Sequence, residues 1–208
     1  MLVGKARRGY KRYQPLMIMF LYPQMYRKLK RGPQVILPKD IGIIITFSEV
    51  NKNSVCVDAG TGSGWLAVSL ARIAKEVYSY DTRDDFLAIA EKNRQMLRLD
   101  NLVLKNGDVF RRIDEKEVDL VTLDIPSSEK ALTNAKKALK PDGCVVGYLP
   151  HMEQVKNFVK KLNSLKFYDL YTVEVNVRDM LVRDEGVRPS TKGIWHTAYL
   201  VFARKQSV

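Results

Sequence analysis

The 208-residue sequence has few of the residues that build metal sites and covalent cross-links. It has two cysteines, Cys56 and Cys144, each inside an apolar run, and two histidines, His151 and His196. Two cysteines do not make a zinc site by themselves, and the histidines supply no recognisable ligand spacing. We therefore expect two buried free thiols and no bound metal, with a disulfide as the less favoured alternative.

Long hydrophobic runs are also missing. The longest, LMIMFLY at 16–22, has seven residues, whereas a helix that crosses a membrane needs about 20. The run follows a basic stretch, as in a signal peptide, but no small-residue cleavage site comes after it. With 46% hydrophobic and 28% charged residues, the composition is typical of a soluble globular protein. We expect a cytoplasmic protein with no membrane partner.

Acidic residues are absent from the first 33 positions, although these contain nine of the Lys and Arg residues of a chain whose net charge is +12. Tyr10, Tyr13, Tyr22 and Tyr26 lie among the basic residues. This mixture favours a phosphate backbone with bases available for stacking. A solvated tail, or an arm on anionic lipid, is the alternative. We divide the chain into a basic arm at 1–33, the remnant of an RNA-binding region, and a domain at 34–208.

From residue 34 onward, short apolar runs alternate with segments of helical period, a pattern typical of a mostly parallel sheet covered on both faces. A turn, PDG, is expected at 141–143, and two last strands at 168–178 and 196–204 are joined by a loop. This order predicts an α/β, Rossmann-like fold of the class I methyltransferase type, with a seven-stranded, mostly parallel sheet that ends in an antiparallel hairpin. The preceding strands are expected at 54–59, 76–80, 102–105, 118–124 and 144–149, and the helices at 38–50, 65–74, 84–97, 129–139 and 152–165.

A glycine-rich turn, DAGTGSG at 58–64, follows the first expected strand. Its three glycines let the backbone approach a ligand closely, and the N–H groups that begin the next helix can receive a carboxylate. A dinucleotide site usually has the spacing GxGxxG, whereas the glycines here alternate as GxGxG. The turn alone is a weak signal, so the residues around it decide which cofactor it fits.

Acidic residues stand at the carboxyl ends of three successive strands. Asp58 ends the first, Asp81 the second, where an acid can bridge ribose hydroxyls, and Asp108 follows the third, where it can accept from an adenine amino group. Any one of them alone is as well explained as a helix cap or a solvated loop residue. Together they indicate S-adenosylmethionine. The expected cofactor-binding residues are Asp58, Gly60, Thr61, Gly62, Ser63, Gly64, Asp81, Asp108 and Asp124.

Four segments resemble the tRNA adenine-N1 methyltransferase family, which modifies an adenine in the T-loop: FLYPQMYRKLKRGPQVILPKDIG at 20–42, VCVDAGTGSG at 55–64, LVTLDIP at 120–126 and GVRPSTKGIWHTAYLVFARK at 186–205. The resemblance implies methyl transfer from S-adenosylmethionine to adenine N1 of tRNA, by a homo-oligomer that is a tetramer or a dimer. It also implies that Asp124 is catalytic, because a carboxylate near the 6-amino group favours electron density at N1 and stabilises the cationic product. Contact with the cofactor alone is the alternative role for Asp124.

Three further residues are expected to bind the substrate. Arg183 and Arg188 flank a loop expected to overhang the site and suit phosphate groups. His196 lies in the most specific of the four segments and could contact the target nucleotide, although a structural histidine at the start of a strand is equally compatible with its position.

The sequence departs from the family pattern at the substrate side. Members usually carry a small N-terminal β-barrel that helps to hold tRNA, whereas only the basic arm precedes the match here. The usual YPKD is LPKD, with Leu37 in place of the tyrosine, and Ser127 and Ser128 follow the fourth-strand motif. Two other functions therefore stay open: a methyltransferase acting on a small molecule or a protein isoaspartyl group, and a non-catalytic RNA-binding partner subunit.

Overall fold

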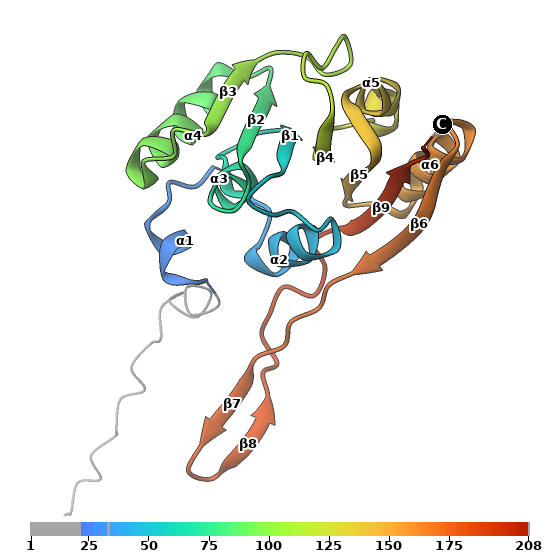
Figure 1. Cartoon of the computed structure of the whole chain (residues 1–208). Helices are drawn as coiled ribbons and strands as arrows, with labels where there is room; N and C mark the ends of the chain where they lie inside the picture. The colour runs from blue at the N-terminus through green and yellow to red at the C-terminus, as the bar shows by residue number, and fades with distance from the viewer. Residues whose placement is uncertain (1–21, 33, 208) are drawn as a thin grey trace, which may run out of the picture.

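A seven-stranded sheet forms the centre of the computed structural model, which describes residues 22–32 and 34–207 (Figure 1). The strand order is β3-β2-β1-β4-β5-β9-β6, in which β9 pairs antiparallel with both β5 and β6, and the other pairs are parallel. The expected fold class is confirmed. The strands of this sheet are β1 (Val55–Ala59), β2 (Glu76–Asp81), β3 (Leu102–Asn106), β4 (Val118–Leu123), β5 (Leu139–Leu149), β6 (Phe167–Glu174) and β9 (Tyr199–Lys205).

Helices cover both faces of the sheet because its central strands are apolar on both sides. Alternate strand residues such as Cys56 and Leu120 pack with α2 and α3, while their neighbours Val57 and Val121 pack with α5 and α6. Both cysteines are buried free thiols, as expected. The helices are α1 (Gln24–Lys28), α2 (Pro38–Phe47), α3 (Trp65–Ala71), α4 (Asp84–Leu97), the 3-10 helix η2 (Ser128–Ala131), α5 (Leu132–Ala138) and α6 (Met152–Ser164).

The expected turn at 141–143 is wrong, because these residues lie within β5. Asp142 adopts a positive φ of 61°, and the pairing of β5 with β4 shifts register between Val118 and Leu120. A Cβ at Gly143 would lie 2.9 Å from the carbonyl oxygen of Val118. The Pro-Asp-Gly sequence therefore makes an irregularity inside a strand that continues past it, which is how a β-bulge accommodates turn-forming residues.

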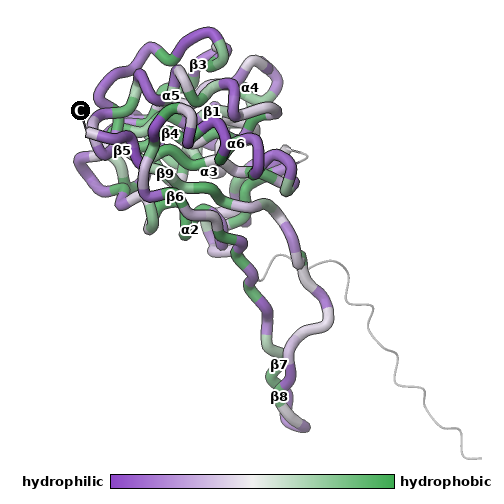
Figure 2. Tube along the Cα trace, turned by 90° about the vertical axis from the view of Figure 1, so that its right-hand side faces the viewer, coloured by the Kyte–Doolittle hydropathy of each residue, from purple (hydrophilic) through white to green (hydrophobic). Residues whose placement is uncertain are grey.

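The loop expected before the last strand contains a separate two-stranded hairpin, β7 (Met180–Arg183) and β8 (Gly186–Pro189). The hairpin projects away from the body of the molecule (Figure 1). It carries both hydrophobic and hydrophilic residues (Figure 2), and Val182 and Val187 are 75% and 62% exposed. Its strands pair with each other alone in the part of the chain that the structure describes. The preceding strand ends at Glu174, four residues earlier than expected.

Part of the expected basic arm packs onto the domain. Tyr22 and Tyr26 are 7% and 8% exposed and contact the ring of Trp65 at centroid distances of 5.5 and 5.2 Å. The expectation that these two tyrosines are available to stack on bases is therefore wrong. The arm's first basic residues, at positions 5–12, and the tyrosines at 10 and 13 lie outside the described residues. None of the described helices is long and apolar enough to cross a membrane.

Candidate active site

The glycine-rich turn rests on a buried carboxylate. Asp58, on β1, is 2% exposed and accepts hydrogen bonds from Ser79 (2.6 Å) and Thr122 (2.8 Å). These two residues stand directly beside Asp58 on the neighbouring strands β2 and β4, so the sheet register itself supplies the donors. Burial raises the pKa of Asp58, and the two hydroxyl donors act in the opposite direction. The Thr61 and Ser79 hydroxyl oxygens are 2.7 Å apart, which joins the turn to this network.

The turn has a shape that only glycine permits at its first position. Gly60 has φ +94°, and a Cβ there would lie 2.1 Å from the backbone oxygen of Asp124. Gly64 has φ +78°, and a Cβ would lie 3.0 Å from the Cβ of Ala90. The backbone therefore passes close to the end of β4 on one side and to α4 on the other. Because the three glycines have no side chains, a ligand can approach the backbone of the turn closely.

Asp81 lies at the end of β2 and contacts the same turn. One of its carboxylate oxygens accepts the Gly62 N–H at 2.9 Å, and the other accepts the Arg83 N–H at 3.0 Å. The structure thus brings Asp58, Asp81 and the turn together, as the sequence pattern predicts.

Asp124 follows β4 and lines a cavity of about 260 Å³. Its N–H donates to the Ala59 carbonyl oxygen at 2.8 Å, which fixes it beside the turn. Burial raises the pKa of its carboxyl group to about 7, and the negative charges of Asp58 and Asp81 add to this effect. A carboxyl group with this pKa is partly protonated near neutral pH. The other residues around the cavity are Arg31, Gln34, Val35, Leu37, Tyr148, Pro150, Ile194 and Thr197.

A buried ion pair of Lys39 and Asp40 bonds to Thr197, which lines this cavity. The Lys39 ammonium lies 2.7 Å from a carboxylate oxygen of Asp40, and it also donates to the Val175 carbonyl and the Thr197 hydroxyl, each at 2.7 Å. Thr197 in turn donates to Asp40 at 2.9 Å. Burial, together with the charge of Asp40, raises the pKa of the neighbouring Tyr148. These hydrogen bonds join the first turn of α2 to the segment that follows β6 and to the segment that precedes β9.

A second group of hydrogen bonds holds the chain before α2 against the turn. The Asn93 amide of α4 is fully buried, donates to the carbonyls of Lys30 (2.9 Å) and Ser63 (2.8 Å), and accepts the Lys30 N–H at 2.7 Å. The Gly32 N–H donates to the Ser63 hydroxyl at 2.9 Å, and the Trp65 indole donates to Lys30 at 3.0 Å. Residues 30–32 are therefore held against one side of the glycine-rich turn.

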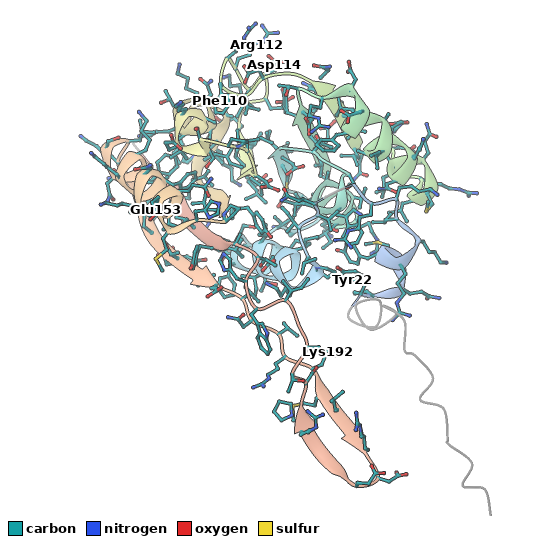
Figure 3. All side chains as sticks on the ribbon, turned by 180° about the vertical axis from the view of Figure 1, so that it is seen from behind. Tyr22, Phe110, Arg112, Asp114, Glu153 and Lys192 are labelled. Carbon is teal, nitrogen blue, oxygen red and sulfur yellow. The ribbon has the colours of Figure 1, made fainter. Side chains whose placement is uncertain are left out.

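Asp108 belongs to a different cavity, of about 620 Å³, at the end of β3. Its carboxylate accepts the Phe110 N–H at 2.8 Å and lies 3.7 Å from Arg111. Arg112 and Asp114 also line this cavity, at the opposite end of the molecule from the hairpin (Figure 3). The structure thus places Asp108 beside the next strand end, outside the cavity that contains Asp124.

The structure does not bring the three expected substrate-binding residues to the Asp124 cavity. Arg183 and Arg188 lie on β7 and β8, in the projecting hairpin, so the expected overhang is wrong (Figure 1). His196 lies 2.6 Å from Glu174 and 2.8 Å from the Pro150 carbonyl, so both ring nitrogens have protein partners. The hydrogen bond to Glu174 raises its pKa, and the one to Pro150 adds to this.

Several residues of the site were not singled out from the sequence. Ser79 and Thr122 could have been found from the sequence, because the parallel register of the expected strands places both beside Asp58. Asn93 and Thr197 have none, because their partners are distant in the chain. Among the described residues, no group of three or more His, Cys, Asp or Glu side chains could hold a metal ion.

Comparison with known proteins gives consistent matches. The family model described as tRNA methyltransferase complex GCD14 subunit matches residues 17–192. The tRNA (adenine(57)-N(1)/adenine(58)-N(1))-methyltransferase TrmI of Methanocaldococcus jannaschii is 36% identical, covering 96% of this chain and 80% of that protein. The solved structure of tRNA (m1A58) methyltransferase TrmI from Aquifex aeolicus is 29% identical, with a TM-score of 0.82, and covers 88% of this chain and 75% of that one. A structure titled SAM-dependent O-methyltransferase from Thermotoga maritima is 30% identical, with a TM-score of 0.84, and the match covers 89% of this chain and 72% of that one.

Proposed function

The chain belongs to the GCD14 family of tRNA methyltransferase complex subunits, and on this basis we propose that it methylates N1 of an adenine in tRNA with S-adenosylmethionine as the donor. The observation that carries the proposal is the position of Asp124. It lies beside the glycine-rich turn and lines a cavity large enough for a flat base.

The residues around the turn fit S-adenosylmethionine. Gly60, Gly62 and Gly64 have no side chains and so leave room for the amino-acid portion of the ligand. The Thr61 hydroxyl joins the turn to Ser79, and the Ser63 hydroxyl holds Gly32 beside the turn. Asp81 offers a carboxylate for ribose hydroxyls, and Asp108 offers one for the adenine in the separate cavity at the end of β3. The cofactor supplies a methyl group on a positively charged sulfonium. Asp58 acts beneath the turn, as the buried anchor that fixes it.

Asp124 supplies the chemistry that the acceptor needs. As a carboxylate it accepts a hydrogen bond from the 6-amino group of adenine, which raises electron density at N1, and its charge balances the cationic ring that forms. A pKa of about 7 means that near neutral pH the ligand-free protein holds Asp124 partly protonated. We therefore expect kcat/KM, which reports the ligand-free protein, to increase as the pH rises through 7.

The basic residues before α2 suit the RNA backbone. Arg31 lines the cavity that contains Asp124, and it is exposed. We keep Arg183, Arg188 and His196 as proposed RNA contacts. The two arginines lie on a hairpin that projects away from the Asp124 cavity of the same chain. They would therefore contact a part of the RNA outside that cavity, or RNA bound to another copy of the chain. A homo-oligomer, dimer or tetramer, and a cytoplasmic location stay predictions, and sedimentation at working concentration tests the former.

Methyl transfer to unmodified tRNA tests the proposal. The purified protein is incubated with labelled S-adenosylmethionine and unmodified tRNA, and the nucleosides are analysed. We expect labelled 1-methyladenosine, and we expect Asp124→Asn to lower the rate at least about 100-fold while retaining affinity for S-adenosylhomocysteine.

The matched control is Asp100→Asn, the same exchange at an exposed position, which should leave the rate unchanged. Cofactor binding without any labelled tRNA nucleoside would remove the RNA substrate and leave a methyltransferase for a small molecule or a protein. No cofactor binding at all would favour the non-catalytic partner subunit.

A further inference from the structure

A second cavity adjoins the one that contains Asp124. Leu37 and Ile194 line both cavities and form the wall between them. Tyr22, Arg178, Lys192 and Trp195 lie on the other sides of the second cavity, which sits where the hairpin segment joins the body; Tyr22 and Lys192 are labelled in Figure 3. The side chains of Leu37 and Ile194 would separate a group bound here from one beside Asp124.

Tyr22 lines this cavity, and its buried hydroxyl has no hydrogen-bond partner among the described residues. Its side chain is 7% exposed, and its hydroxyl is the single buried side-chain polar atom of the described residues that lacks a hydrogen bond. Buried polar groups in native proteins are nearly always paired, and each exception calls for an explanation. The neighbouring Tyr26 shows the usual situation, with its hydroxyl 2.6 Å from that of Ser69. A ligand with a polar edge, bound in this cavity, would give Tyr22 the partner that the described residues do not supply, once a small movement of the side chain exposes the hydroxyl.

The open side of the cavity has a flat apolar surface and positive charge. Trp195 and Ile194 are 49% and 39% exposed, and the Arg178 guanidinium lies 5.2 Å from the centre of the Trp195 ring. Arg178 and Lys192 are both exposed, and Asp179 is the acidic residue of the lining. Aromatic rings beside arginine and lysine are the features on which single-stranded bases stack while their phosphates pair with the cations.

The size of the cavity restricts its occupant. Its volume is about 60 Å³, against about 260 Å³ for the cavity that contains Asp124. The smaller cavity therefore suits the edge of one flat ring that enters from the open side, and the larger one suits a whole base. The Lys39 ammonium, which also belongs to the lining, already has three partners and leaves the charged contacts to Arg178 and Lys192.

We propose that this second cavity binds the base of the nucleotide next to the target adenine in the RNA chain. The base stacks on Trp195 and Ile194, its polar edge meets the Tyr22 hydroxyl, and an adjacent phosphate pairs with Arg178 and Lys192. The proposal rests on the proposed function, since it assumes an RNA whose target base lies beside Asp124. Two unstacked neighbouring bases would then occupy the two sides of the Leu37–Ile194 wall.

The first test uses the fluorescence of Trp195, which is exposed, whereas the other tryptophan, Trp65, is 3% exposed. The full-length protein is titrated with an unmodified tRNA stem-loop and with two versions that lack either the base 5′ or the base 3′ to the target adenine. We expect the complete RNA to quench the fluorescence, one of the two abasic RNAs to lose most of the quenching, and Trp195→Phe to abolish it. Equal quenching by all three RNAs would overturn the proposal and leave a phosphate site only.

The second test separates the Tyr22 hydroxyl from a general loss of stability. Tyr22→Phe removes a buried hydroxyl that has no partner among the described residues, so it should not lower the melting temperature. It should lower kcat/KM for the complete RNA about tenfold. On the RNA that lacks the recognised base it should have no effect. Tyr26→Phe is the matched control, because it removes a paired hydroxyl: it should lower the melting temperature and leave kcat/KM unchanged. An equal effect of Tyr22→Phe on complete and abasic RNA would contradict the proposal.

The two tests also separate this proposal from the proposed function. If no 1-methyladenosine forms but quenching depends on one flanking base, the function fails and the base site stands. If 1-methyladenosine forms at equal rates on all three RNAs, the function stands and the base site fails.

Discussion

Replacing Asp124 by asparagine should stabilise the ligand-free protein, by an amount that depends on pH. The folded protein raises the pKa of this carboxyl from 3.8 to about 7, mainly by burial and then through the charges of Asp58 and Asp81. The folded state therefore binds the proton more tightly than the unfolded state does. Charging Asp124 destabilises the fold, and the neutral amide of asparagine avoids that cost.

The size of the effect follows from the shift. Below pH 3.8 the carboxyl is protonated in both states, so it contributes no pH-dependent difference. Between pH 3.8 and 7 the unfolded state is ionised while the folded state keeps its proton, and the cost grows by about 1.4 kcal/mol per pH unit. Above pH 7 both states are ionised and the cost levels off at about 4 kcal/mol.

Urea unfolding of the wild type, Asp124→Asn and Asp100→Asn at each unit from pH 4 to pH 8 measures this directly. We expect the advantage of Asp124→Asn over the wild type to grow from about pH 4 to pH 7 and then to stay constant. Asp100→Asn should follow the wild type throughout. A difference that does not change with pH, or an Asp124→Asn protein that is less stable than the wild type at pH 8, would refute the assignment of a raised pKa to this carboxyl.

Three further substitutions test the parts that hold the site. Gly60→Ala would place a Cβ 2.1 Å from the Asp124 carbonyl oxygen, so affinity for S-adenosylhomocysteine, measured by calorimetry, should fall at least about tenfold; unchanged affinity would show that the turn does not touch the cofactor. Asn93→Ala removes three hydrogen bonds to Lys30 and Ser63 and should lower the free energy of unfolding by about 2–3 kcal/mol in urea. Asp40→Asn leaves the buried Lys39 without its carboxylate and should cost about 3 kcal/mol in the same assay; a loss below about 1 kcal/mol would mean that Thr197 and Val175 suffice as partners.

The sequence predicts the structure well where the local residue pattern and the tertiary structure agree. The central strands are apolar at successive positions, as buried parallel strands are, and their alternation sends Cys56 and Val57 to opposite faces of the sheet. The glycine-rich turn follows directly on β1, and Asp81 ends the next strand in the order of the sheet. Since the carboxyl ends of parallel strands meet at one edge, the proposed cofactor half of the site follows from local patterns and topology.

Turn-forming residues misled where tertiary pairing competes with local preference. The bulge around Asp142 keeps the strand going because β5 has partners on both sides, β4 and β9, whose hydrogen bonds outweigh the local preference for a turn. The hairpin of β7 and β8 escaped prediction for the opposite reason. Its side chains are exposed on both faces, so Val182 and Val187 show none of the alternation that marks a half-buried strand.

The proposed acceptor half of the site depends on contacts that no local pattern contains. Lys39 and Asp40 meet Thr197, and Asn93 meets Lys30, across 157 or more and 63 positions of the chain respectively. The Asp124 cavity is consequently assembled from the segment before α2, the ends of β4 and β5, and the loop before β9. Leu37, where the family usually has tyrosine, belongs to this half and to the wall that separates the two cavities. Leucine is smaller than tyrosine at this position, and the exchange leaves the glycine-rich turn intact. We therefore expect Leu37 to affect which bases the cavities accept and to leave the affinity for the cofactor unchanged.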